Sequence, residues 1–230
     1  MPVGFQVFGD SGAVQIDDNY ANLALVGKGT LSPGNPGQDG GNMMQVSTGA
    51  ANAMIFLRAS QIGVAVGAVS DSGGVRTFTI WMASGVTSVN YWVFGTPPAP
   101  TSRFGLQIFR SDGQCTFDSA NKYMRVIGNI DTSSATIGGT AGKQFGLPGV
   151  GPGGYAVALN YNGFIIERLS IQGGQTLFRV NQQWCFSISG NALTVWNRPN
   201  VAGITYPPGS TSTTTYKAPQ SAIILDVTGL

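Results

Sequence analysis

The chain has 230 residues and a net charge of +2, and Lys, Arg, Asp and Glu together make up 10% of it, against roughly a quarter in an average soluble protein. So small a charge, with no basic cluster, argues against nucleic acid binding, which needs several Lys and Arg on one face. The chain has no histidine, the side chain most often used for acid–base catalysis near neutral pH and for metal binding. No apolar run approaches the roughly 20 residues of a membrane span, and MPVGFQVFGDSG does not resemble a secretory signal.

Short alternating runs separated by Gly, Pro, Asn and Ser predict an all-β chain of antiparallel strands. FQVF and AVQI flank the turn Gly9–Gly12 and are expected to form a hairpin, after which NLALV is a third strand. MIFLRASQIGVAV, TFTIWM and NYWVF continue the strands of the first half, with Asp71–Gly74 as a hairpin tip. Leu31–Asn42 is expected to be a long loop, and no stretch has helical apolar spacing over three turns.

The second half begins in the same way, with LQIF and CTF around Ser111–Gly113, followed by KYMRVI. Tyr161–Phe164 contains Asn-Gly, the strongest turn signal in the chain, and predicts a hairpin between the apolar runs on either side. TLFRV, WCFSI, LTVW and SAIILDV are the remaining predicted strands. Thr132–Gly154 and Tyr206–Pro219 are expected to be loops because Gly, Pro, Ser and Thr dominate them.

The two beginnings form an internal repeat. Residues 4–27 align without a gap with residues 105–128, and the identical pairs are Gly4 and Gly105, Gln6 and Gln107, Phe8 and Phe109, Gly12 and Gly113, Asp17 and Asp118, and Gly27 and Gly128. A period of this length is that of a small domain rather than of a solenoid unit. The sequence therefore predicts two tandem antiparallel β-sandwich-like domains, residues 1–96 and 104–230, joined by a proline-rich linker at 97–103.

The two cysteines, Cys115 and Cys185, both lie in the second half. Cys115 aligns with Val14, an apolar strand position, which favours a thiol that packs as a small apolar group. Synthesis in the cytosol disfavours a disulfide. Two free thiols are expected.

Catalytic residues are not predicted. Glycoside hydrolysis is the one enzymatic alternative left open, because it needs only two carboxylates; the candidates are Asp17, Asp18, Asp112, Asp118 and Glu167. However, Asp17 and Asp118 occupy equivalent repeat positions, where Asp commonly ends a strand and accepts hydrogen bonds from nearby backbone N–H groups. The Asp-containing turns also lack the spaced oxygen ligands of a calcium loop. The sequence predicts neither a metal site nor a cofactor.

Two tyrosines are the only candidate contact residues. Tyr206 and Tyr216 lie in the predicted Pro-, Gly-, Ser- and Thr-rich loop, with little apolar sequence around them. Aromatic faces presented by loops suit sugar rings or a protein partner. The competing interpretation is that both rings only anchor the loop.

The repeated stretch resembles the opening of small tail proteins of long-tailed bacteriophages. The match is carried by Gly105–Phe109, Gly113, Asp118-Ser119 and Arg125–Gly128, and more loosely by Gly4–Gly27. The resemblance covers about a quarter of the chain and implies a virion component of the tail tip, baseplate or fibre. It brings no catalytic residues. One difference is that the motif occurs twice here, where one opening copy is expected.

The resemblance fits the composition, because a virion protein is made in the host cytoplasm without a signal and reaches the outside by lysis. The first hypothesis is a non-enzymatic tail protein, a suspected homotrimer that contacts neighbouring tail proteins and contributes to attachment to a host surface receptor. The alternative is a free carbohydrate-binding, lectin-like β protein. A tail glycosidase ranks last.

Overall fold

A computed structural model describes residues 22–33, 42–61, 63–97, 99–100, 104–135, 142–149, 154–159, 184–196 and 221–230 in full. For residues 6–8, 14–17, 164–170, 176–183, 197–199 and 211–217 it describes strand pairing only. Every regular element in these residues is a β-strand, so the predicted all-β class is confirmed. None of the described residues belongs to a helix long and apolar enough to cross a membrane.

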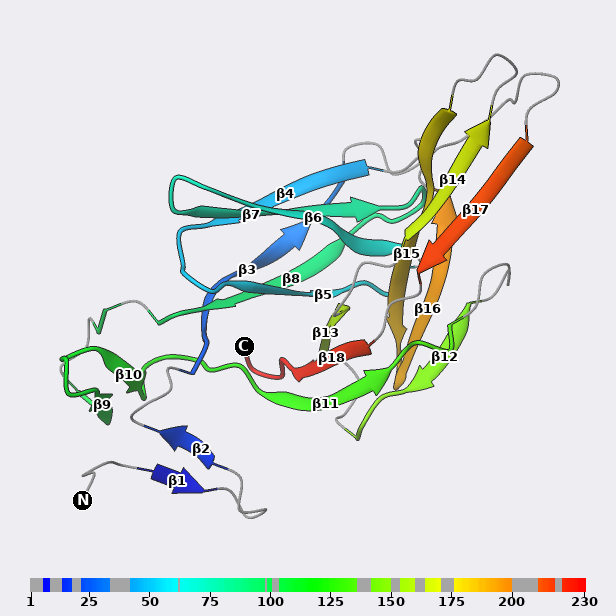
Figure 1. Cartoon of the computed structure of the whole chain (residues 1–230). Helices are drawn as coiled ribbons and strands as arrows, with labels where there is room; N and C mark the ends of the chain where they lie inside the picture. Colours follow the sequence, from blue (N-terminus) through cyan, green and yellow to red (C-terminus); the bar gives the residue numbers. More distant parts are fainter. Residues whose placement is uncertain are drawn as a thin grey trace.

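Two stacked antiparallel sheets form the body of the molecule (Figure 1). The first sheet runs in the order β11 (Val126–Asp131), β18 (Ser221–Asp226), β13 (Tyr155–Leu159), β5 (Met54–Arg58), β8 (Val89–Gly95) and β3 (Ala24–Leu31). The second runs in the order β12 (Lys143–Gly146), β16 (Ala192–Pro199), β15 (Thr176–Ser189), β6 (Val64–Ser72), β7 (Val75–Met82) and β4 (Asn42–Thr48). Two more strands, β14 (Phe164–Ser170) and β17 (Thr211–Lys217), extend it from β15.

Two small hairpins stand outside the sandwich (Figure 1). One pairs β1 (Gln6–Phe8) with β2 (Val14–Asp17), and the other pairs β9 (Gln107–Phe109) with β10 (Cys115–Asp118). Both predicted hairpins are therefore confirmed. Their registers agree as well, since Gln6 faces Asp17 just as Gln107 faces Asp118, and each ladder shifts once near its turn.

The core lies between the two sheets. Strand periodicity puts alternate side chains on each face, and the inward-facing ones form one continuous apolar cluster that includes Leu57, Ile80, Phe186 and Ile224, each at most 1% exposed. The first sheet is also apolar on its outer face, where Phe56 and Phe94 meet edge to face with ring centroids 5.9 Å apart. The central strands are therefore buried on both sides, which explains their unbroken apolar sequences.

The predicted linker at 97–103 does not divide the sheets. The first sheet contains three strands from either side of it, and the second contains three from the first half and five from the second. The halves meet edge to edge where β13 pairs with β5 and β15 pairs with β6. We call this place the junction. Joining edges in this way removes two pairs of exposed strand edges, which would otherwise have to be protected. That each half folds by itself stays a prediction.

The strand order is the same in both halves. In the first sheet, the outer strands β3 and β11 are each the first strand of their half after the small hairpin. The middle strands β8 and β18 are each the last strand of their half along the chain, and β5 and β13 lie at the junction. In the second sheet the outer strands β4 and β12 and the middle strands β7 and β16 correspond in the same way. Strands β14 and β17 belong to the second half alone.

Three local predictions were wrong. The chain between β13 and β14 does not make a hairpin, because β13 pairs with β18 and β5 while β14 pairs with β15 and β17; burial of both faces of β13 decided its partners. The predicted loop 132–154 contains β12, and the predicted loop 206–219 contains β17. In β17 the run of Thr residues forms the strand, as the β-branched side chain favours.

Candidate functional site

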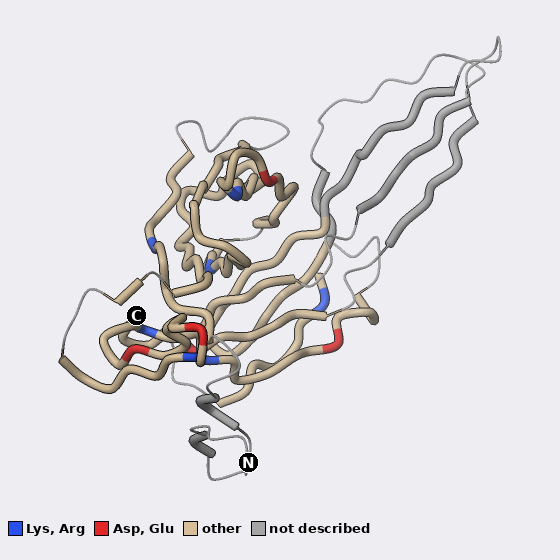
Figure 2. Tube along the Cα trace, turned by 60° about the vertical axis from the view of Figure 1, so that its left-hand side comes forward, with Lys and Arg blue, Asp and Glu red and all other residues tan. Residues whose placement is uncertain are grey.

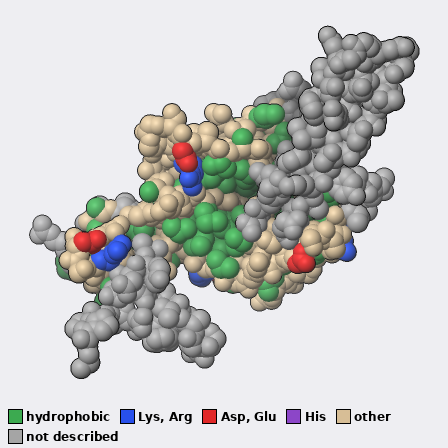
Figure 3. Space-filling view, in the orientation of Figure 1, with side chains coloured by type: hydrophobic (Ala, Val, Ile, Leu, Met, Phe, Trp, Pro, Cys, Tyr) green, Lys and Arg blue, Asp and Glu red, His purple; other side chains and the backbone are tan. Residues whose placement is uncertain are grey.

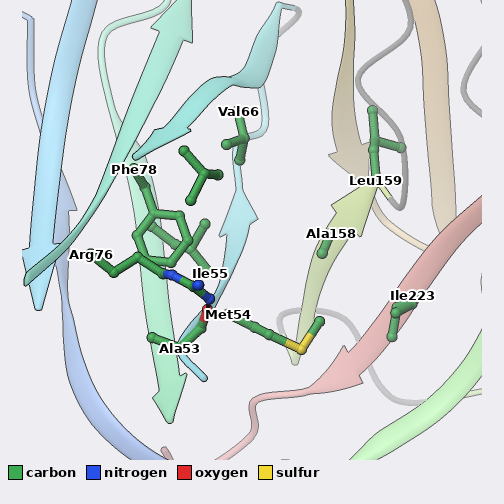
Figure 4. A pocket seen from close by; sticks show the side chains of 10 residues that line it. Ala53, Met54, Ile55, Val66, Arg76, Phe78, Ala158, Leu159 and Ile223 are labelled. Atoms are coloured by element: carbon green, nitrogen blue, oxygen red, sulfur yellow. Dashed lines mark hydrogen bonds between the residues drawn. The ribbon is translucent and has the colours of Figure 1, made fainter. Parts of the chain in front are cut away.

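A small apolar cleft lies at the junction of the two halves, and we call it the junction cleft. It has a volume of about 280 Å³ and is lined by Ala53, Met54 and Ile55 of the first half's β5 region, Val66 and Val69 of β6, Arg76 and Phe78 of β7, Ala158 and Leu159 of β13, and Ile223 of β18. Figure 4 shows these side chains lying around one space. In Figure 3 apolar side chains gather at the middle of the same face.

The cleft exists because the strands separate there. Only one residue pair joins each pair of junction strands, Val157 with Leu57 in the first sheet and Phe186 with Val64 in the second. Past these pairs the ladders do not continue toward Leu159 and Val66, so the strands diverge and leave a recess. Since the recess opens at the strand ends rather than on a regular sheet face, no sequence pattern marks it.

Arg76 is the only charged residue lining the cleft, and its guanidinium is already engaged. Its Nε and Nη2 donate to the two carboxylate oxygens of Asp71, both at 2.7 Å, and Nη1 donates to the Ala53 carbonyl at 2.9 Å. The hydrogen bond from Arg76 to the Ala53 carbonyl links the two sheets. The Asp71 hydrogen bond with Arg76 lowers the pKa of that carboxyl below its usual value, and burial opposes the shift only partly. Because the cation is neutralised in place, the cleft suits an apolar side chain better than an anion.

Asp71 also lies where the sequence predicted a hairpin tip. Strand β6 ends at Ser72 and β7 begins at Val75, and the two glycines between them have φ angles of 57° and 78°. Two consecutive positive φ angles are the requirement of a tight two-residue hairpin turn, which only Gly meets without strain. The prediction that this Asp-Ser-Gly-Gly stretch is a hairpin tip is confirmed.

The second candidate surface is the hairpin β9–β10 with the residues just before it, and we call its exposed large apolar side chains the hairpin face. Three large apolar side chains are exposed there: Phe104 at 86%, Leu106 at 48% and Phe109 at 49%. Between them Ile108 is only 7% exposed, and Phe117 stacks on Tyr123 with ring centroids 4.8 Å apart. The hairpin thus buries Ile108 and stacks Phe117 within its own segment, and it leaves Phe104, Leu106 and Phe109 exposed.

The residues of the phage-like motif hold this hairpin closed at its base. Gly105 has a φ of 107°, and a Cβ there would collide with Ser119. The Ser119 hydroxyl accepts from the Leu106 N–H at 2.9 Å, and the Gln107 amide donates to Asp118 at 3.1 Å. These contacts give a structural reason for Gly, Gln, Asp and Ser at these positions, because they fix the base of the hairpin.

Asp118 behaves as the sequence predicted. Strand β10 ends at this residue, and its carboxylate, in a residue that is 3% exposed, accepts from the Ala120 N–H at 2.9 Å. Asp112 likewise accepts from the Gln114 N–H at 3.0 Å within its turn. Asp17 ends β2 and Glu167 lies in β14, but their side chains, and all of Asp18, are outside the described residues. Of the five carboxylate candidates, the structure thus describes the side chains of Asp112 and Asp118 alone, and each accepts a hydrogen bond within its own turn.

Of the two predicted contact tyrosines, the structure places Tyr216 alone, and differently from the expectation. Tyr216 lies in strand β17, where it faces Ile165 of β14, rather than in a loop. Tyr206 lies outside the described residues. Their role in binding stays a prediction.

The two cysteines are not joined in a disulfide, as predicted. Cys185 is 0% exposed in β15, and Cys115 is half-buried in β10. Burial raises the pKa of the Cys115 thiol above its usual value. Within the described residues no group of three or more His, Cys, Asp or Glu is arranged to hold a metal ion.

The comparisons extend none of these observations to a known group of proteins. Charged side chains are widely spaced on the described chain (Figure 2), and its two notable surface features, the junction cleft and the hairpin face, are both apolar. Comparisons with protein-family models, with curated proteins and with solved structures found no match for this chain.

Proposed function

We propose that this chain is a non-enzymatic structural or adhesion component of a bacteriophage tail, assembled with copies of itself and with neighbouring tail proteins. One observation carries the proposal: the segment that resembles the openings of phage tail proteins is also the one that presents Phe104, Leu106 and Phe109 to solvent. An exposed apolar patch on a small β-hairpin is typical of an interaction site. It is also a weak element alone, since an isolated two-stranded hairpin is marginally stable in water.

The surface chemistry supports the same proposal. The described ion pairs are few and exposed, such as Arg110 with Asp112 at 4.0 Å and Arg125 with Asp226 at 3.5 Å. Pairs of this kind contribute little to stability or to specificity. Contacts made by this chain would therefore depend on apolar burial and uncharged hydrogen bonds, which are insensitive to salt. Such contacts suit a particle that must stay assembled in varied external media and attach there to a host surface.

The direct test is to locate the chain in particles. An antibody raised against the purified protein is used for immunoelectron microscopy, and purified particles of the phage that carries the gene are analysed by mass spectrometry. Labelling at the tail, together with peptides from the chain, is the expected result. A chain missing from purified particles would overturn the proposal, and glycan binding by the isolated monomer would then favour the lectin-like alternative.

A second test addresses the hairpin face. A phage lacking the gene is complemented with a chain in which Phe104, Leu106 and Phe109 are each replaced by Ser. Burying one such side chain contributes about 1.5–3 kcal/mol, so we expect incorporation to fall by about a hundredfold or more. The matched control replaces the exposed Val75 at the β6–β7 tip, which does not line the junction cleft, by Ser. Equal incorporation of the two variants would exclude the hairpin face as the contact.

A further inference from the structure

The outer strands of the two large sheets differ in how they are protected against pairing. At the four ends of the two six-strand runs, three of the outer strands carry a charged residue, Lys28 in β3, Asp131 in β11 and Lys143 in β12. Strands β3 and β11 also contain register shifts, and β12 has only four residues. Charges, bulges and short length are the usual devices that keep a sheet edge from pairing with another chain.

The fourth outer strand, β4, has none of these devices. Its sequence NMMQVST holds seven residues without a charge, Pro or Gly, and its ladder with β7 runs without a shift. No other strand among the described residues pairs with its second edge. Figure 1 shows β4 at the rim of the sandwich. A regular, uncharged edge of this length is a ready template for one more strand.

The two faces of β4 have different chemistry. Met44 and Val46 lie opposite Ile80 and Phe78 of β7 and pack against the core. On the outer face Met43 is 71% exposed, and Gln45 and Ser47 are exposed as well. An added strand would have to continue this alternation, with apolar residues toward the core and uncharged polar residues outside.

A second copy of β4, running antiparallel, meets both requirements. If the twofold axis passes through Gln45, Met44 of one copy faces Val46 of the other on the core side, and Met43 faces Ser47 on the outer side. Gln45 then faces its own equivalent, and a side-chain amide can both donate to and accept from a second amide. No like charges are opposed. If one of the other three outer strands paired with its own copy about its charged residue, two like charges would face each other and repel.

We infer that β4 is the interface between two copies of this chain, which pair edge to edge and make their second sheets continuous. The occupant of the edge is thus a second copy rather than a foreign strand, because the strand is complementary to itself in both face and charge. This inference rests on the edge alone and does not depend on the tail assignment.

The test places a charge at the proposed axis. Gln45→Lys and Gln45→Glu are made separately, and self-association of each full-length protein is measured by sedimentation velocity over a dilution series. Two like charges facing each other across the axis should raise the dimer dissociation constant by about tenfold or more. Mixing the two variants should restore a one-to-one heterodimer. The control, Ser70→Lys, puts the same charge on an exposed residue of β6, two strands inward.

Each result either supports or overturns pairing through β4. Loss of the dimer in both variants, its recovery on mixing and its persistence in the control support the inference. A wild-type chain that stays monomeric at every concentration overturns it, as does a dimer that the Gln45 variants leave intact or that Ser70→Lys also disrupts. Hydrogen exchange gives an independent measurement: the amides of β4 should become protected as the wild-type concentration rises, and unchanged exchange there would contradict the pairing.

Discussion

Replacing Leu57 by Ala tests whether the two halves behave as one folding unit. Leu57 is 0% exposed and is the residue of β5 that faces Val157 of β13 across the junction. A buried Leu→Ala change costs about 2–5 kcal/mol because it removes apolar contact and leaves a cavity. With a loss of about 3 kcal/mol and a urea slope of about 3 kcal/mol per molar, the midpoint should fall by about 1 M.

The assay follows each half separately by tryptophan fluorescence during urea unfolding. Trp81 and Trp92 belong to the first half, and Trp184 and Trp196 to the second. In a background with Trp81→Phe and Trp92→Phe, the signal comes from the second half alone. In the complementary background, with Trp184→Phe and Trp196→Phe, the signal comes from the first half alone. We expect Leu57→Ala to lower the urea midpoint by the same 1 M in both backgrounds, because both halves contribute strands to each sheet.

A control and a refuting outcome complete the experiment. Val69→Ala, at a residue that is 51% exposed, should change stability by less than about 0.5 kcal/mol. If Leu57→Ala moves only the transition reported by the first-half tryptophans, the halves unfold independently. The reasoning from shared sheets would then be refuted and the sequence-based prediction of two domains supported.

Two further predictions concern the thiols and the glycines. A thiol reagent should label Cys115 in the folded protein, slowly at neutral pH because its pKa is raised, and should label the buried Cys185 only after denaturant is added; two thiols that react rapidly in the native state would contradict this. Gly74→Ala, at a φ of 78° with open space around it, should cost about 1–2 kcal/mol in thermal unfolding. Gly142→Ala should cost more, since a Cβ there would lie 2.8 Å from the Trp196 ring as well as at a φ of 68°; equal costs would show that the ring moves aside freely.

The sequence predicted local structure well, because local structure depends on neighbouring residues. The alternation in Gly4–Asp17 and Gly105–Asp118 was enough to place both hairpins, and Asp118 was correctly expected to end its strand. Strand partners were harder. The Asn-Gly signal before Phe164 predicted a hairpin between the neighbouring apolar runs, but β14 pairs with β15 and β17 instead. Neighbouring residues alone do not decide such a choice of partner.

The surface sites were mostly beyond prediction from the sequence. The junction cleft is formed by residues from five strands that are distant in the chain, and it exists because two ladders stop after a single pair. The exposure of apolar side chains here could have been suspected, because alternation in LQIF puts Leu106 and Ile108 on one face of the strand and Phe109 on the other, so that apolar residues occur on both faces. Tyr216 was assigned to a loop because its Thr-rich neighbourhood was judged by polarity rather than by β-propensity.

The equal strand order of the two halves has a consequence for how far assembly can proceed. A molecule with two similar ends, each bearing an open strand, could join at both and grow into a filament of unlimited length. Here the ends are alike in topology but not in chemistry: one carries the uncharged β4, and the other carries the short β12 with Lys143. If β4 is the interface between two copies, the difference of one lysine and three residues leaves a single one of these two ends able to pair, and growth by this contact stops at two copies.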